Sequence, residues 1–149
     1  METSSSYKRL AESVKRLVFG ERAEMGLKSY KDLLIWQKGI ELVKEIYSIT
    51  SLFPKDEMYG LSSQMQRASV AIPSNIAEGY FRKHRKEFIQ FLAIALSSAA
   101  ELETQITISK SLDKFKHVDF SHAENLTNEI MKMTYVMIDK LHLNLTANR

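Results

Sequence analysis

The densest cluster of charged side chains is a run of five basic residues whose chemistry suits phosphate binding. Its members are Arg82, Lys83, His84, Arg85 and Lys86. The run comes directly before a long apolar helix, and cations at the N-terminus of a helix oppose its macrodipole. Helix stability therefore does not explain these cations, whereas contact with nucleic-acid phosphates would. The nucleic-acid-binding candidates are Arg82, Lys83, Arg85 and Lys86. A solvated turn is the alternative, and the sequence leaves both interpretations open.

A weaker basic group, made of Lys110, Lys114 and Lys116, stands further along the chain. These residues come at the end of the same long helix, where cations complement the negative end of the macrodipole. We interpret this second group as a solvated helix end that contributes to stability.

Metal-binding patterns are weak in this sequence. Di-metal bundles use carboxylates from facing helices together with a Glu-x-x-His pair on two of them. Here Asp139 and His142 have the spacing of such a pair on one helix, without a counterpart on another. His117, Asp119 and His122 form a second cluster, but it falls in and beside a predicted loop and is interpreted as solvated. We expect no bound metal and no cofactor.

Catalytic patterns are equally weak. The chain has no cysteine, which excludes thiolate catalysis, zinc–thiolate sites and disulfides. Ser97 and Ser98 have no histidine within a helical turn, so their small size suits close helix contact instead of nucleophilic attack. Glu101 and Glu103 point roughly 200° apart on a helix and cannot act as a carboxylate pair. We expect a protein that is not an enzyme and has no small-molecule substrate.

Charge is distributed unevenly along the 149 residues. Residues 1–31 hold seven Lys or Arg against four Glu, whereas residues 32–149 hold fourteen basic and fourteen acidic residues. A nucleic-acid role therefore depends on local clusters and not on net charge. The N-terminus lacks the apolar core of a signal peptide, and no apolar stretch is long enough to span a bilayer. We expect a cytoplasmic protein without membrane contact.

Hydrophobic spacing divides the chain into two parts. Residues 5–19 have an amphipathic helical pattern and residues 20–31 contain glycines and many charges, so residues 1–31 are predicted to be a helix and a linker. Residues 32–149 are predicted to form one domain of four helices with short connections, which favours an up-down-up-down order. The predicted fold class is all-α, an antiparallel four-helix bundle with an extra N-terminal amphipathic helix.

The third helix of this domain, predicted over about residues 84–112, has the clearest periodicity. Its apolar residues alternate spacings of four and three, which places them on one stripe of a helix. They are Phe88, Leu92, Ala95, Ala99, Leu102 and Ile106. The fourth helix carries a comparable inward stripe, made of Leu126, Ile130, Met133, Met137 and Leu141.

The first helix of the domain carries two adjoining apolar stripes, enough to face two neighbours. One is Ile35, Leu42, Ile46, Ile49 and Phe53, and the other is Trp36, Ile40, Val43 and Tyr47. A lone four-helix bundle needs little more than one stripe per helix, so the second stripe predicts a homo-oligomer. Asp32 is the candidate cap for the first helix and Ser121 for the fourth.

Pro73 falls inside the predicted second helix, which ends near Gly79. Proline has no amide hydrogen, so the Ser69 carbonyl loses its usual partner and the helix axis is expected to kink. Ser69, Ser74 and Asn75 are close enough to compensate for that loss. Gly79 is expected to adopt the left-handed conformation that ends many helices.

These residues belong to segments that resemble a known family. The segments are ASVAIPSNIAEGYFR at residues 68–82, KEFIQFLAIALSSAAELETQI at residues 86–106 and LLIWQKGIELVKEIY at residues 33–47. Together they resemble the bacterial four-helix bundle family of proteins encoded in intervening sequences of 23S rRNA genes. An Ile-Pro-Ser-Asn-Ile-Ala-Glu-Gly string inside a helix has no generic structural reason to recur. The signature positions are Arg67, Pro73, Asn75, Glu78, Gly79, Arg82, Glu87 and Phe88.

The resemblance implies an up-and-down bundle, a ring-shaped homo-oligomer that is commonly a pentamer, and no enzymatic activity. The signature residues are expected to be structural first. Arg67 and Glu78 are candidates for ion pairs with Glu101, Glu103 or Arg82 on neighbouring helices. A distant relative, the accessory variability protein of diversity-generating retroelements, binds reverse transcriptase and nucleic acid. RNA or a reverse transcriptase is therefore the implied partner. The predicted function is an RNA-binding or ribonucleoprotein accessory factor, and the alternative is a protein–protein interaction scaffold without nucleic-acid binding.

Overall fold

A computed structural model describes residue 5, residues 29–82 and residues 84–147 of the chain. Its long helices are α2 (Leu34–Thr50), α3 (Leu61–Phe81), α4 (Arg85–Ser111) and α5 (Ser121–Ala147). Three short 3-10 helices, η1 (Tyr30–Asp32), η2 (Lys55–Glu57) and η3 (Asp113–Phe115), precede or connect them. The predicted N-terminal helix over residues 5–19 lies outside the described residues except for residue 5, as does most of the predicted linker.

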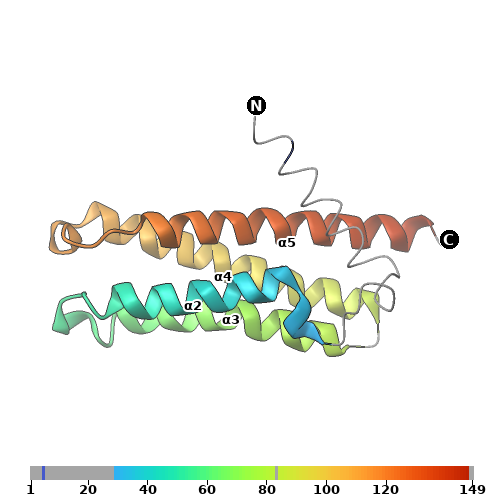
Figure 1. Cartoon of the computed structure of the whole chain (residues 1–149), viewed down its shortest axis with the longest axis horizontal. Helices are drawn as coiled ribbons and strands as arrows, with labels where there is room; N and C mark the ends of the chain where they lie inside the picture. Colours follow the sequence, from blue (N-terminus) through green and yellow to red (C-terminus); the bar gives the residue numbers. More distant parts are fainter. Residues whose placement is uncertain (1–4, 6–28, 83, 148–149) are drawn as a thin grey trace.

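The four long helices form an antiparallel bundle, as the sequence predicted (Figure 1). In the ring of neighbours α2 contacts α3 and α5, and α4 contacts the same two helices. Each short connection reverses the chain, so the α3–α4 turn lies at one end of the bundle and the α2–α3 and α4–α5 connections lie at the other (Figure 1). None of the helices in the described part of the chain is long and apolar enough to cross a membrane.

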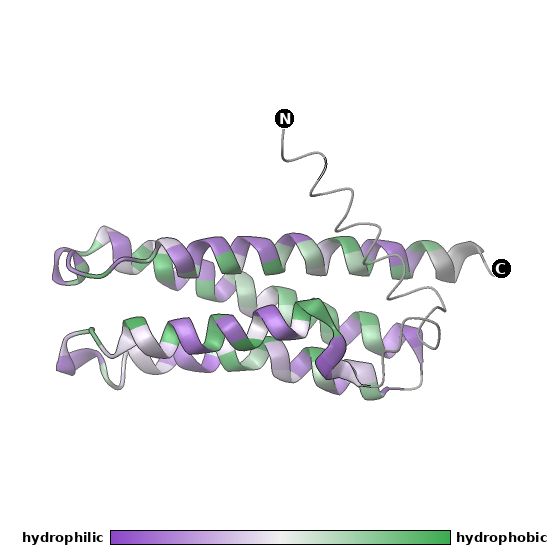
Figure 2. Cartoon of the chain, viewed as in Figure 1, coloured by the Kyte–Doolittle hydropathy of each residue, from purple (hydrophilic) through white to green (hydrophobic). Residues whose placement is uncertain are grey.

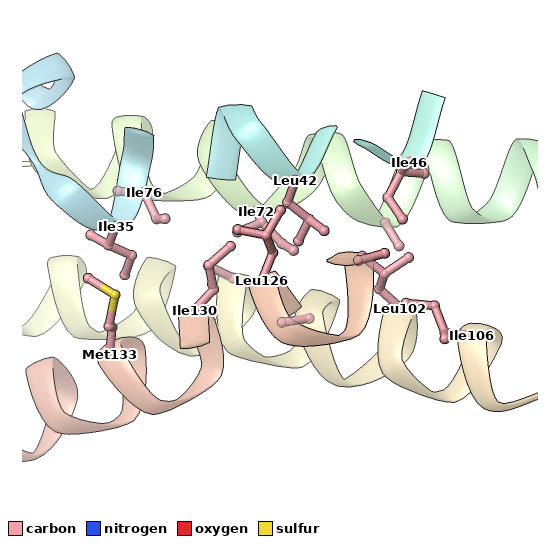
Figure 3. Close-up of a cluster of buried hydrophobic side chains, with 14 of the residues drawn as sticks. Ile35, Leu42, Ile46, Ile72, Ile76, Leu102, Ile106, Leu126, Ile130 and Met133 are labelled. Atoms are coloured by element: carbon pink, nitrogen blue, oxygen red, sulfur yellow. The ribbon is translucent and has the colours of Figure 1, made fainter. Parts of the chain in front are cut away.

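The core is built from the inward apolar stripes of all four helices (Figure 3). Every residue of the predicted α4 and α5 stripes is buried. Apolar and hydrophilic residues alternate along the helices (Figure 2), and the apolar side of each helix packs into the core. Only one of the two α2 stripes is buried. The other, Trp36, Ile40, Val43 and Tyr47, is partly or largely exposed.

Two predicted helix caps are wrong, because other residues occupy the capping positions. Asp32 belongs to η1, where its Oδ2 accepts a hydrogen bond from the Ser29 amide at 3.1 Å, and α2 begins after Leu33 without a side-chain cap. Ser121 is a donor and not a cap. Its amide and hydroxyl both donate to Asp119 Oδ1, at 2.9 and 2.6 Å. These two bonds from Ser121 lower the pKa of the Asp119 carboxyl below its usual value.

Buried hydroxyls in the core are satisfied by the backbone of their own helices. Thr50, Thr127 and Thr134 each donate to the carbonyl four residues earlier, at 2.6 to 2.7 Å. Ser109 does the same at 2.8 Å. Because a buried hydroxyl without a partner would be costly, these bonds let small polar residues sit between packed helices. These four hydroxyls are therefore satisfied within their own helices.

Candidate nucleic-acid interface

The basic turn, defined as residues 82–86, connects α3 to α4 at one end of the bundle (Figure 1). Arg82 ends α3, and its amide donates to the Gly79 carbonyl at 3.2 Å. His84 stands at the start of α4 and gives that helix no side-chain cap. Lys83, a predicted contact residue, lies outside the described residues. The first backbone amides of a helix have no partners within that helix. Those of α4 lie at the same end of the bundle as the basic turn.

Arg82 is held by two contacts, one with its own helix and one with α4. Its Nη2 lies 3.1 Å from Glu78 Oε1, one turn earlier in α3. Glu78 thus pairs with Arg82 as expected, but along its own helix and not with a neighbouring one. Its guanidinium carbon lies 4.9 Å from the centre of the Phe91 ring of α4. Both partners are near the surface, so Arg82 remains partly exposed. The pair with Glu78 neutralises part of its charge and fixes its direction.

Arg85 and Lys86 occupy the first turn of α4. Within residues 29–82 and 84–143, neither of them has a carboxylate at ion-pair distance. Lys86 is exposed and Arg85 is partly buried. Glu87 follows them in the same turn, where an acidic residue complements the macrodipole. Arg85 and Lys86 are thus cations in an electrostatically unfavourable place without a compensating partner in the described structure.

The second basic group is different, because every one of its lysines has an acidic partner. The pairs are Lys110 with Glu124 at 2.6 Å, Lys114 with Asp56 at 2.9 Å and with Glu57 at 2.7 Å, and Lys116 with Asp113 at 3.1 Å. The Lys114 pairs join η3 to η2 and so connect the two loops at that end of the bundle. These lysines have structural partners already, in agreement with the interpretation of the group as a stabilising helix end.

Lys114 also shifts the pKa values of its two acidic partners. Its hydrogen bonds hold the pKa of the Asp56 carboxyl and that of the Glu57 carboxyl below their usual values. The Leu61 amide, which donates to Glu57 Oε2 at 3.1 Å, lowers the Glu57 pKa further. The two carboxylates in turn raise the pKa of Lys114. All three groups therefore stay ionised over a wider pH range than they would alone.

Pro73 is a buried residue in the middle of α3, which continues through it. Its predicted neighbours donate to carbonyls, but none of them to the Ser69 carbonyl that the proline leaves free. The bonds run from Ser74 Oγ to Val70 at 2.7 Å, from Asn75 Nδ2 to Ala71 at 2.7 Å and from Ser69 Oγ to Gln66 at 2.9 Å. The Ser74 and Asn75 side chains thus add hydrogen bonds to carbonyls in the turn before Pro73.

Gly79 does not end α3, and the prediction of a left-handed cap there is wrong. The helix continues to Phe81, and Gly79 is one of its buried residues. A β-carbon at position 79 would stand 2.7 Å from Phe91 Cβ and 3.0 Å from Phe88 Cδ2. Glycine is needed because α4 approaches α3 too closely for any side chain, and not because of a special backbone conformation.

The remaining predicted residues have separate positions. Phe88 is buried in the core, and Arg67 is exposed on α3. His117 Nε2 lies 2.7 Å from the Leu52 carbonyl, and His122 Nε2 lies 3.5 Å from Glu41 Oε1. Among the described residues, no three His, Asp or Glu side chains converge where a metal ion would bind.

An aromatic cluster beside the basic turn was missed by the sequence reasoning. Tyr30 of η1 is its centre, with ring centroids 5.4 Å from Trp36, 6.4 Å from Tyr80 and 5.5 Å from Phe81. Phe81 is 71% exposed and directly precedes Arg82. The signal available in the sequence was the pair of aromatic residues, Tyr80 and Phe81, immediately before the cations. Tyr30, assigned to the linker by the sequence, packs here against the bundle.

Two hollows of about 380 and 290 Å³ lie at the other end of the bundle, where α4 ends and α5 begins. Lys110 and Glu124 line both of them, and these two residues form the 2.6 Å ion pair described above. The two charged groups that both hollows share are thus paired with each other. This region fits a structural role better than a binding site.

Over the residues that the structure describes, the fold is a four-helix bundle with a basic turn in which Arg85 and Lys86 have no acidic partner. Residues 31–136 match the family of 23S rRNA-intervening sequence proteins, and the chain belongs to that family. The structure is also similar to that of a protein of unknown function from the S23 ribosomal protein family of Bacteroides thetaiotaomicron VPI-5482. That likeness has a TM-score of 0.61 at 24% sequence identity and covers 71% of this chain and 96% of the other. No curated protein matches the chain.

Proposed function

We propose that this protein is a non-enzymatic, oligomeric accessory factor that binds RNA phosphates through its basic turn. The observation that carries the proposal is the contrast between the two basic groups. Every lysine of the second group has a carboxylate partner, whereas Arg85 and Lys86 have none among the described residues. An anionic ligand would compensate cations that oppose the macrodipole of α4. The proposed contact residues are Arg82, Lys83, Arg85 and Lys86.

Oligomerisation would make this small site effective. The outer stripe of α2 leaves apolar surface open in a single copy, with Tyr47 49% exposed. Burial of that stripe against another copy would form a ring, for which five subunits is the number that the family resemblance implies. Each subunit would add its own basic turn, and linked weak sites bind a long RNA more tightly than one site does.

The test is a binding measurement with a structured RNA at two salt concentrations. Phosphate contacts release counterions, so the affinity should fall steeply as salt rises. Binding that does not depend on salt would contradict phosphate contact, and no binding at low salt would reject the RNA-binding proposal.

A protein–protein scaffold is the second candidate function, and one observation favours it. The α2–α3 connection exposes apolar side chains at the end of the bundle away from the basic turn, namely Leu52, Met58 and Tyr59. Such a patch suits a protein partner, and a reverse transcriptase is the partner that the resemblance to the accessory variability protein implies. Complex formation with a purified reverse transcriptase, in the absence of RNA, would favour this candidate.

A further inference from the structure

Phe81 is a large apolar residue that lies outside the buried core. It ends α3 and is 71% exposed, whereas Phe88 in the core is 4% exposed. Leaving a phenylalanine in water forgoes the free energy that its burial would contribute. The stability of the bundle therefore does not explain why a phenylalanine occupies this position.

The Phe81 ring is exposed but supported from one side. It meets Tyr30 at a centroid distance of 5.5 Å and Tyr80 at 6.1 Å, with interplanar angles of 63° and 89°. Tyr30 is itself packed edge-on against Trp36 at 5.4 Å. These edge-to-face contacts restrain the ring while most of its surface stays open to solvent. A restrained ring loses little conformational entropy when a flat ligand stacks on it.

The charges around Phe81 indicate which flat ligand fits. Arg82 follows it in the chain, and Arg85 and Lys86 begin α4 on the other side of the turn. An aromatic face beside cations that track a phosphate backbone is the arrangement that binds single-stranded nucleic acid, because unpaired bases can stack. The same patch on a second copy of the chain would bring like charges together, which disfavours a symmetric contact through this surface.

We infer that Phe81 is a stacking platform for an unpaired base, so that the basic turn selects single-stranded segments of RNA. The inference rests on the proposed function of the turn, because the cations must hold the backbone for a base to reach the ring. Duplex RNA should bind less tightly, since its bases are already stacked on one another.

The test compares two ligands of equal charge. One is an oligouridine on the order of ten nucleotides long, and the other is an abasic ribose-phosphate chain of the same length. The wild-type protein should bind the oligouridine about tenfold more tightly, the effect expected for one stacked base. Phe81→Leu should remove that difference and leave the affinity for the abasic chain unchanged. Phe81→Trp, which keeps an aromatic face, should retain the difference.

Tyr59→Leu is the matched control, because Tyr59 is an aromatic residue 93% exposed in the α2–α3 connection at the far end of the bundle. It should bind both ligands as the wild type does. Equal binding of both ligands by the wild type would overturn the stacking inference and leave phosphate binding intact. A loss of affinity for both ligands in Phe81→Leu, or a change in its oligomeric mass, would also overturn it by assigning Phe81 a structural role. If neither ligand bound at low salt, the proposed function itself would fail.

Discussion

Gly39 of α2 lies directly against Pro73 of α3, and a β-carbon at position 39 would stand 3.2 Å from Pro73 Cβ. Both residues are buried. The proline ring thus fills the space that the glycine leaves, and the two residues together set how closely α2 and α3 approach. This contact gives Pro73 a physical role in packing.

Replacing this proline tests whether its shape matters to the assembly. Proline inside a helix costs about 3 kcal/mol, so Pro73→Ala should maintain or raise helix content. It should also leave a gap beside Gly39 and misplace the contacts of Ile72 and Ile76, so we expect the oligomer to be weakened. Circular dichroism melting and light scattering on the same sample measure both effects. A variant that melts higher and keeps the wild-type mass would show that Pro73 does not shape the assembly.

Gly79→Ala should destabilise the bundle although alanine is the better helix former. The gain in helix propensity is about 1 kcal/mol, but the new β-carbon would meet Phe91 Cβ at 2.7 Å, which is attached to the α4 backbone and cannot rotate away. Overpacking of this kind costs about 1 to 3 kcal/mol, so we expect a net loss in urea unfolding. Gln64→Ala, at an exposed position in the same helix, is the control and should change the unfolding free energy little. Equal or greater stability of Gly79→Ala would contradict the close approach of α3 and α4.

The Lys114 pairs should make stability depend on pH in the acidic range. The folded-state pKa values of Asp56 and Glu57 are lowered, so their contribution is present above the usual carboxyl values of 3.8 and 4.5 and is lost as pH falls through the folded-state values. Lys114→Gln should therefore lower the melting temperature at pH 7, and the difference from the wild type should shrink below about pH 4. Lys116→Gln is the control, since its pair with Asp113 is fully on the surface. A difference that stayed constant down to pH 2 would assign the effect to packing instead of charge.

The outer stripe of α2 should hold the oligomer together. Ile40→Glu combined with Tyr47→Glu would place charges in a buried apolar interface, so the assembly should dissociate toward the 17.2 kDa chain mass. Light scattering on the wild type should give several times that mass, with five copies as the predicted number. Ser48→Glu, at an exposed position on another face of α2, should keep the wild-type mass. A wild type that is monomeric at micromolar concentration would contradict the prediction.

The fold could be predicted from the sequence because its signal is periodic. The spacing of the apolar residues from Phe88 to Ile106 predicts which face of α4 is buried, without knowledge of the neighbouring helices. The roles of Gly39 and Gly79 could not be predicted in this way, because a glycine that ends a helix and one that admits a neighbouring helix look alike until the neighbour is placed. The η1 cap was present as Ser29 followed three residues later by Asp32, a pattern that the interpretation of this segment as a linker concealed.

The candidate site was only partly accessible to the same reasoning. The basic run is contiguous in sequence, so its cations were easy to find. Which lysines were already paired depended on contacts such as that of Lys114 with Asp56, 58 positions apart along the chain. The aromatic support of Phe81 likewise depends on Tyr30, which is distant in sequence and meets it only when η1 packs on α3. Charge could be located from the sequence, but its compensation could not.

The salt dependence of RNA binding, measured for the wild type and for a variant with all four contact residues changed to Gln, tests the central proposal most directly. The variant replaces Arg82, Lys83, Arg85 and Lys86. Each phosphate contact that is lost should lower the slope of log affinity against log salt by about 0.7 to 0.9, and affinity should fall alike for all RNA sequences. Lys110→Gln with Lys116→Gln, which removes two cations that already have carboxylate partners, should keep the wild-type slope. If the variant with four substitutions kept its oligomeric mass, the wild-type affinity and the wild-type salt slope, the basic turn would not be the RNA-binding surface.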